Sequence, residues 1–302
     1  MTDNSSAALS HPGDRWVNSP AWTLLEQAHD GRMLLVLTGG ADETYIVDEA
    51  VSDACVHRVF QAWQNGSLSS LRDDPECGAA VRQIRRVGAL VPPRALGEVN
   101  RFSVAWLGDP CDALMPVLTT MVAEYRIALQ GDVPPDAVAA TDGNIEDLLL
   151  VVRTNAQWES ALRSYAALRP RQRHLFIDTA YHHTVSIGPY VVPGDTACVA
   201  CLGHRVAHRW GDLSGPAKPA VSTRPHTIAA LLAPLLTAPG GLLPFIEHSV
   251  SLNLQSLSSV RDKVFQLPWC PVCESRHDPL AGALDLPWQV SPPVPLSGPA
   301  GH

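Results

Sequence analysis

The sequence predicts an α/β protein in which a small N-terminal domain precedes a doubly wound sheet. The chain has 302 residues, whereas one domain usually takes roughly 100–200. Short strand patterns come before helix patterns in the first part, and from Arg101 onward the two alternate, as in a parallel sheet with helices on both faces. We therefore expect two domains, residues 1–98 and 99–276, and a proline-rich tail, residues 277–302, without regular structure.

Three short strands are expected in the first domain, followed by three helices. The strands cover Trp22–Gln27, Arg32–Thr38 and Glu43–Val47, with turn signals at His29-Asp30-Gly31 and Gly39-Gly40. The first helix begins at a cap formed by Ser52-Asp53 and ends at Gly66, and the other two cover Ser67–Leu71 and Glu76–Val87. An antiparallel meander with three helices in this order predicts a winged helix-turn-helix.

Strands and helices alternate in the second domain. The predicted strands cover Phe102–Leu107, Arg126–Gln130, Asp147–Val152, His174–Ile177 and Thr184–Val192, with further strand pairing in Leu252–Phe265. The predicted helices cover Ala113–Glu124, Ala156–Leu168 and Thr227–Thr237. This alternation favours a parallel, doubly wound sheet.

Four cysteines stand in two C-x-x-C pairs, Cys198 with Cys201 and Cys270 with Cys273. A gap of two residues lets both sulfurs of a pair face one centre, and two such pairs complete the tetrahedral thiolate shell that zinc prefers. A closed shell leaves no open position for water or substrate. The pattern therefore predicts a structural zinc site that joins two distant segments. Two redox motifs or a pair of disulfides are the other interpretations of this spacing.

Charge and composition narrow the classes of function. The net charge is −8 and the pI about 5.8, which argues against general nucleic-acid binding because that needs a basic face. A winged helix often reads DNA. Here Arg82, Arg85 and Arg86 lie on its third predicted helix, but acidic residues surround them in the sequence.

No signal peptide or membrane span is expected from the sequence. The N-terminus lacks a basic stretch followed by an apolar run, and the longest apolar runs are far shorter than the roughly 20 residues of a spanning helix. Seven cysteines, four of them assigned to zinc, fit a reducing cytoplasm better than a disulfide framework.

The loop after the first strand of the second domain lacks the features of a phosphate-binding loop. Such a loop needs several glycines so that backbone N–H groups can approach the phosphates. The segment Gly108–Asp112 holds one glycine, two aspartates and Pro110, which has no N–H to donate. We therefore expect no ATP site. No catalytic triad or Cys–His pair is evident, and we expect no catalytic residue.

The segment Gly188–Cys201, the helix Thr227–Thr237 and the segment Trp269–Cys273 resemble the ThiF/MoeB type of ubiquitin-activating-like fold. More narrowly, the chain resembles the ThiF-like "ocin" proteins of thiazole/oxazole-modified (RiPP, thiopeptide-like) peptide clusters, which are leader-binding partners of YcaO cyclodehydratases. The resemblance implies a winged-helix precursor-peptide recognition element followed by a zinc-stapled, usually non-adenylating ThiF-like domain. It also implies a homodimer as one arrangement, since such relatives are commonly dimers. Arg153-Thr154-Asn155 departs from the acidic residue expected in adenylating members.

The resemblance also implies where a leader peptide binds. The peptide would add as a strand along the edge of the third strand, with apolar side chains and arginines of the third helix forming the other wall. The residues implied are Thr44, Tyr45, Ile46, Val47, Val81, Arg82, Ile84 and Arg85. Alternatively, Ile46, Val81 and Ile84 belong to the core and the arginines to a solvated face.

Two classes of function follow from these expectations. The first is a non-catalytic subunit that binds the leader of a ribosomal precursor peptide and presents the peptide to a YcaO cyclodehydratase for azoline formation. The second is an ATP-dependent, ThiF-like adenylating enzyme acting on a peptide. A winged-helix regulator is a third interpretation.

Overall fold

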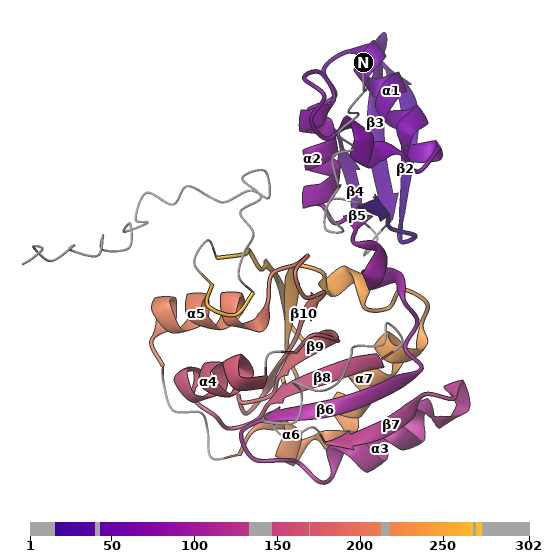
Figure 1. The fold of residues 1–302 in the computed structure, drawn as a ribbon. Coiled ribbons are helices and arrows are strands. Elements are labelled where there is room, and N and C mark those ends of the chain that lie inside the picture. Colours follow the sequence, from indigo (N-terminus) through magenta and orange to yellow (C-terminus); the bar gives the residue numbers. More distant parts are fainter. Residues whose placement is uncertain are drawn as a thin grey trace, which may run out of the picture.

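The computed structural model describes residues 16–39, 43–132, 147–168, 170–212, 218–267 and 270–273. Within these ranges the protein is a mixed α/β structure with a small three-stranded sheet and a large seven-stranded sheet. Figure 1 shows the small sheet and its helices stacked above the large one. The predicted proline-rich tail lies outside the described residues. Among the described residues, no helix is long and apolar enough to cross a membrane.

The small sheet is the predicted antiparallel meander. Its order is β2-β3-β4, formed by Trp22–His29, Arg32–Gly39 and Glu43–Ile46. Asp30 and Gly31 join the first two strands, and both have positive φ, 48° and 76°, the backbone of a tight hairpin turn. The prediction of these strands is confirmed.

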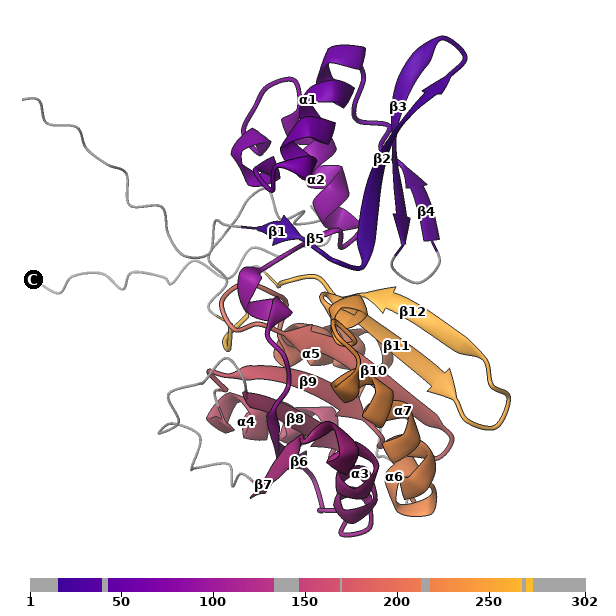
Figure 2. The ribbon, with the colours of Figure 1, turned by 90° about the vertical axis from the view of Figure 1, so that its right-hand side faces the viewer.

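Helices cover one face of the small sheet, as the view in Figure 2 shows. They are α1 (Asp53–Gln64), the short 3-10 helix η2 (Leu68–Leu71) and α2 (Gly78–Arg86). The hydroxyl of Ser52 accepts a hydrogen bond from the backbone N–H of Cys55 at 3.1 Å, so Ser52 caps α1 as predicted. Leu35 and Leu37 of β3 pack with Val56, Val59 and Ile84 of the helices in one buried cluster.

Two short strands that the sequence pattern did not reveal lie between the two sheets (Figure 2). They are β1 (Val17–Asn18) and β5 (Leu90–Val91), which pair with each other. A 3-10 helix, η3 (Pro93–Leu96), follows. Beyond it the buried Arg173 donates to the carbonyl oxygens of Gly97 at 2.5 Å and Glu98 at 3.0 Å, so the connecting segment is anchored to the large sheet.

The large sheet has the order β12-β11-β10-β9-β8-β6-β7. Its parallel strands are β6 (Arg101–Leu107), β7 (Ala128–Asp132), β8 (Asp147–Arg153) and β9 (Arg173–Asp178). The strands β10 (Thr184–Val191), β11 (His248–Asn253) and β12 (Ser259–Lys263) pair antiparallel. These three strands follow the alternating segment from which a parallel sheet was predicted, and they extend that sheet in the antiparallel sense. Residues 179–183 between β9 and β10 are too few for a crossover, which takes about a dozen.

Helices lie on both faces of the large sheet. The helices α3 (Leu114–Val122) and α7 (Pro225–Thr237) pack on one face, and α4 (Trp158–Leu168) and α5 (Val199–Trp210) on the other. Shorter helices are η4 (Ala123–Tyr125), α6 (Ala220–Thr223) and η6 (Leu243–Phe245). The side chains of β8 alternate between the two apolar clusters, as expected for a central strand that is buried on both sides.

Candidate functional site

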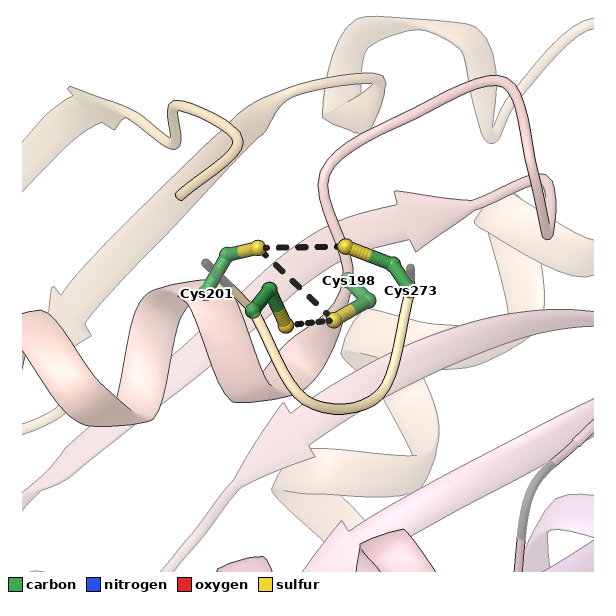
Figure 3. Close-up of side chains that lie close together, drawn as sticks. Cys198, Cys201 and Cys273 are labelled. Carbon is green, nitrogen blue, oxygen red and sulfur yellow. Dashed lines mark hydrogen bonds between the residues drawn. The ribbon is translucent and has the colours of Figure 1, made fainter. Parts of the chain in front are cut away.

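Four cysteine side chains meet between α5 and the turn that follows β12. Cys198 is the N-cap residue of α5 and Cys201 lies in its first turn, while Cys270 and Cys273 come from the later segment. Figure 3 shows the sulfurs pointing toward one centre. All four sulfurs lie within 4.8 Å of one another, and they form a group that could hold a metal ion. The sequence predicted this set of residues.

The sulfur–sulfur distances fit a tetrahedral metal site. They are 3.8 Å from Cys198 to Cys201, 3.5 Å from Cys198 to Cys270 and 3.6 Å from Cys201 to Cys273. A tetrahedron with metal–sulfur bonds of about 2.3 Å has edges of about 3.8 Å. A disulfide would need sulfurs about 2.05 Å apart, and the cysteines are unbonded. The geometry thus fits a shared ion better than either covalent alternative.

The surroundings of the cysteine cluster are apolar. Cys198, Cys201 and Cys270 are buried, and α4, β8 and α5 contribute to the same apolar cluster. The backbone N–H of Leu267 donates to the Cys201 sulfur at 3.4 Å, a bond that favours a thiolate. A hydrogen bond with Cys201 raises the pKa of Cys198, whereas one with Cys198 lowers the pKa of Cys270. This enclosed cluster suits a structural role.

The strand β4 lies at one edge of the small sheet and pairs only with β3. The backbone N–H of Val47 donates to the carbonyl oxygen of Leu35 at 2.9 Å, so the backbone of Val47 faces β3. Alternation along an antiparallel ladder then turns the backbone groups of Thr44 and Ile46 to the free side. The Ile46 carbonyl oxygen accepts a hydrogen bond from the Gln83 side chain at 3.2 Å. The other outward groups are the ones to which another strand can add.

The four residues predicted for a leader site at the third strand differ in exposure, and three of them, Thr44, Tyr45 and Ile46, belong to β4. Ile46 is 55% exposed and Tyr45 37%, while Thr44 is also exposed. Val47, only 2% exposed, packs in the core beneath α1 and α2. Three of the four side chains are therefore accessible at the edge, and the interpretation of Ile46 as a core residue is wrong.

Two of the four α2 residues predicted for that site are buried. Val81 is 4% and Ile84 0% exposed, and both belong to the core of the small sheet. A contact with a peptide requires an accessible side chain, so Val81 and Ile84 are core residues. The alternative interpretation holds for these two positions.

The contacts that the structure shows for the two predicted arginines are with residues outside β4. The Arg85 guanidinium lies 3.8 Å from the centre of the Trp16 ring, a cation–π contact near β1. The Arg82 Nη1 lies near Gly78, at the start of the same helix. Helical geometry explains this, because residues one or two apart in a helix do not share a face. It is Gln83, which the sequence reasoning missed, that faces β4.

The carboxyl ends of the parallel strands form the place where open α/β sheets usually bind ligands. Here this place is filled by the protein's own side chains. After β6 and β8, the Asn155 side chain donates to the Asp109 carboxylate at 2.6 Å and accepts from the Asp109 N–H at 2.9 Å. A side chain at Gly108 would collide with Asn155 and Thr154. The two loops are thus tied together.

A buried ion pair lies at the ends of β8 and β9. Arg153 donates to Asp178 at 2.7 Å and to the carbonyl oxygen of Ala156 at 2.8 Å, and it stacks on the ring of Trp158. Burial raises the pKa of Asp178, although Arg153 acts in the opposite sense. A cation, Arg153, therefore stands at the last position of β8, in the segment where an acidic residue would be expected in an adenylating enzyme.

The N-terminus of α4 is also occupied. The Asp212 carboxylate accepts hydrogen bonds from the backbone N–H groups of Trp158 at 2.7 Å and Glu159 at 2.8 Å. A helix N-terminus binds a phosphate through such N–H groups. Because Asp212 already uses them, this end of α4 does not offer an anion site.

Comparisons with known proteins give distant structural likenesses. No family model and no curated protein matches the chain. A solved heterocyclase in complex with substrate and cofactor aligns with 86% of this chain and 39% of its own, at 14% identity and a TM-score of 0.42. The E. coli microcin synthetase McbBCD complex with pro-MccB17 bound aligns over 85% and 99%, at 11% identity and a TM-score of 0.44.

A third solved structure, E. coli MccB, aligns with 87% of this chain and 97% of its own, at 12% identity and a TM-score of 0.39. The present chain spans about two fifths of the heterocyclase chains, the second of which is TruD. With TM-scores as low as these, the likenesses carry no argument about function. The function is argued below from the residues.

Proposed function

We propose that this protein is a non-catalytic recognition subunit that binds the leader of a ribosomal precursor peptide along β4. In this role it would present the core of the peptide to a YcaO cyclodehydratase for azoline formation. Holding the peptide raises its concentration near the enzyme and needs no chemistry from the subunit itself. The winged-helix and ThiF-like assignments, and the division near residue 98, belong to this proposal.

The observation that carries the proposal is the open edge of β4. Thr44 and Ile46 turn their backbone groups outward, and Tyr45 and Ile46 are exposed beside them. An extended peptide can pair with such an edge through backbone hydrogen bonds, while alternate side chains give specificity.

The edge strand β12 of the large sheet differs from β4 in its charged side chains, and this difference supports β4 as the peptide-binding edge. Its sequence Ser-Val-Arg-Asp-Lys places three charges in five residues, and Arg261 and Lys263 contact the small sheet and α2. Charged side chains, lysine above all, are a common protection of sheet edges against pairing. The four residues of β4 include no lysine, arginine or proline.

The paired side chains at the carboxyl end of the large sheet's parallel strands support a non-catalytic role. Asn155 with Asp109, Arg153 with Asp178, and Asp212 at α4 occupy the positions where a nucleotide would need free donors. Mg-ATP calorimetry on the full chain tests this part, and we expect no binding. Micromolar affinity, or pyrophosphate release that depends on a peptide, would favour the adenylating alternative.

The cysteine cluster supports a structural zinc ion. Four thiolates in a tetrahedral arrangement form a closed shell, which holds a fold together and leaves no position for substrate. In this proposal Cys198, Cys201, Cys270 and Cys273 bind one ion, and the ion supplies stability to the segment around α5.

Binding of a leader peptide to the full chain tests the proposal. The probe is the fluorescein-labelled leader of a candidate precursor peptide, and binding is measured by fluorescence anisotropy. Ile46→Pro should abolish binding because it removes an outward N–H at the edge. It should leave the sheet folded, since that N–H does not face β3. Circular dichroism verifies the fold.

Arg85→Ala is the matched control for this experiment. Because Arg85 stacks on Trp16 and not on β4, its removal should leave the leader affinity within about twofold of the unchanged protein, the range of a weak surface effect. A leader that binds Ile46→Pro as well as the unchanged protein would contradict the β4 site.

A further inference from the structure

The side-chain amide of Gln83 occupies the end of the open edge. Its nitrogen donates to the carbonyl oxygen of Ile46 at 3.2 Å and to the Asp48 carboxylate, and its oxygen accepts from the backbone N–H of Glu49 at 3.1 Å. The Gln83 amide thus gives the backbone at the end of β4 one donor and one acceptor, as the backbone of a neighbouring strand would. Gln83 acts as a one-residue substitute for an added strand.

This contact limits what the edge can offer to a peptide. Of the outward groups, the N–H and C=O of Thr44 and the N–H of Ile46 are open, whereas the C=O of Ile46 is taken by Gln83. An added strand therefore finds two donors and one acceptor. Past Ile46 it meets Gln83 and helix α2.

The side chains next to the open groups are apolar and lie on opposite faces. Successive residues of a strand alternate, so Tyr45 lies on the helix side, with its ring 5.8 Å from that of Trp22, and Ile46 lies on the outer side, opposite Val36 of β3. Two neighbouring residues of an added strand would therefore each meet one apolar side chain.

The charges around the edge already have partners. Glu43 pairs with Arg261 at 3.1 Å, Asp48 binds Gln83, and Glu49 lies 4.0 Å from Arg86. Arg85 stacks on Trp16, so the three cations Arg261, Arg86 and Arg85 are already engaged within the protein. Selectivity at the edge rests on apolar contacts.

We propose that Gln83 is the stop that sets the register of a peptide on β4, and that the peptide carries two consecutive apolar residues that pack on Tyr45 and Ile46. This inference rests on the proposed function and deepens it. Gln83 is a positioning residue in this inference. The residues of the peptide that the edge selects are two apolar ones, and not acidic ones paired with Arg82 and Arg85.

Backbone ester scanning of one peptide tests the stop. The probe is an acetylated and amidated twelve-residue peptide of serine and threonine with a central Leu-Leu, titrated to millimolar concentration against the full chain and followed by amide chemical shifts. Replacing a backbone N–H by an ester oxygen removes one donor without adding bulk. In the unchanged protein one ester, at the residue that donates to the Thr44 carbonyl, should weaken binding by about fivefold.

The variant Gln83→Met frees the Ile46 carbonyl while keeping an unbranched side chain of similar length. A second ester position, two residues from the first, should then become sensitive, because outward groups recur every two residues in either strand direction. Gln61→Met, the same change on the exposed face of α1, should leave a single sensitive position. One sensitive position in Gln83→Met, or two in the unchanged protein, overturns the stop.

Variants of the peptide test the apolar pair. Changing either leucine to serine should weaken binding by about tenfold, and Asp-Asp in place of Leu-Leu should abolish it, as expected for lost apolar burial. Equal binding of the Asp-Asp peptide overturns this part while the proposed function stands. If no peptide shifts the Thr44 and Ile46 amides, the proposed function fails together with the inference. Should the free chain sediment as a dimer with those amides protected, a second copy occupies the edge and both are overturned.

Discussion

The two sheets of this protein differ in what they leave open. The small sheet ends in β4, and among the described residues no further strand pairs with its outward side, where Gln83 binds the Ile46 carbonyl. Tyr45 and Ile46 are exposed there. The large sheet instead fills the carboxyl ends of its parallel strands with an ion pair, an Asn–Asp bridge and a capped helix. A peptide can bind to a sheet edge through the backbone groups of one unpaired strand. A nucleotide-binding pocket instead needs hydrogen-bond donors that are not already paired with the protein's own side chains. The edge of the small sheet thus leaves backbone groups accessible, whereas the polar groups named at the large sheet are paired with one another.

The two parts also differ in what holds them together. The small sheet depends on one apolar cluster formed by its strands and helices. In the large part, the turn after β12 reaches α5 through the cysteine cluster, which belongs to the apolar cluster on the α4 and α5 face. Loss of the zinc ion that we propose for this cluster should therefore destabilise the large part and spare the small one.

The largest expected effect is that of breaking the cysteine cluster. Cys198→Ser should reduce the metal content from about one zinc per chain to well below one and unfold the segment around α5, since structural zinc contributes many kcal/mol to folding. Metal analysis and amide hydrogen exchange check this. The exchange of α1 and α2 should stay unchanged.

Cys111→Ser is the control for the cysteine variant. Cys111 lies outside the cluster, with its thiol 3.6 Å from the carbonyl oxygen of Val221, so its substitution should leave the metal content unchanged. A fully folded protein without metal would contradict the structural role of the cluster.

Breaking the buried ion pair should have the second largest effect. Arg153→Leu leaves the Asp178 carboxyl buried without its partner, and such losses cost about 3–5 kcal/mol of unfolding free energy. The double variant Arg153→Leu with Asp178→Leu should recover a large part of that loss, because it removes both charges. Urea denaturation of the single and double variants measures the difference. Equal losses of unfolding free energy in the single and the double variant would show that the pair stabilises the fold by packing and not by its charges.

Acid should destabilise the large part before the small one. Burial lowers the pKa of His174 and of His248 to about 4, from 6.5. Between these values the unfolded chain takes up protons that the folded protein does not, so the unfolding free energy is full above pH 6.5 and falls as the pH drops toward 4. Denaturation at pH 7 and pH 5, followed by hydrogen exchange in β9 and α1, measures this. Earlier loss of protection in α1 would contradict the expectation.

The smallest expected effect concerns the contact between the two parts. Arg261 of β12 binds both carboxylate oxygens of Glu43 at 3.1 Å, and Lys263 donates to the carbonyl oxygen of Arg86 at 2.7 Å. Arg261→Ala should cost about 0.2–1 kcal/mol of unfolding free energy, an effect that salt weakens. Unfolding of the two parts should also become less cooperative. Arg163→Ala, which removes an exposed pair within α4, should lower stability slightly without separating the two transitions.

Local signals made much of the fold predictable. The Asp30-Gly31 turn, the Ser52 cap and the two C-x-x-C pairs each depend on residues close in sequence, and the structure has all three where they were expected. The sequence reasoning missed α5. Its first turn coincides with the first cysteine pair, and the pair was interpreted for its metal chemistry alone.

By itself, the sequence determined the meander, the central strands and the four cysteines, because strand alternation, turn residues and ligand spacing act over a few residues. Only the tertiary structure decided which α2 residues face β4. A helix turns about 100° per residue, so an error of one or two positions exchanges Arg82 and Arg85 for Gln83, and the choice depends on how α2 packs against the sheet. The direction of β10 to β12 and the pairing of Arg153 with Asp178 were likewise decided by contacts between segments distant in sequence.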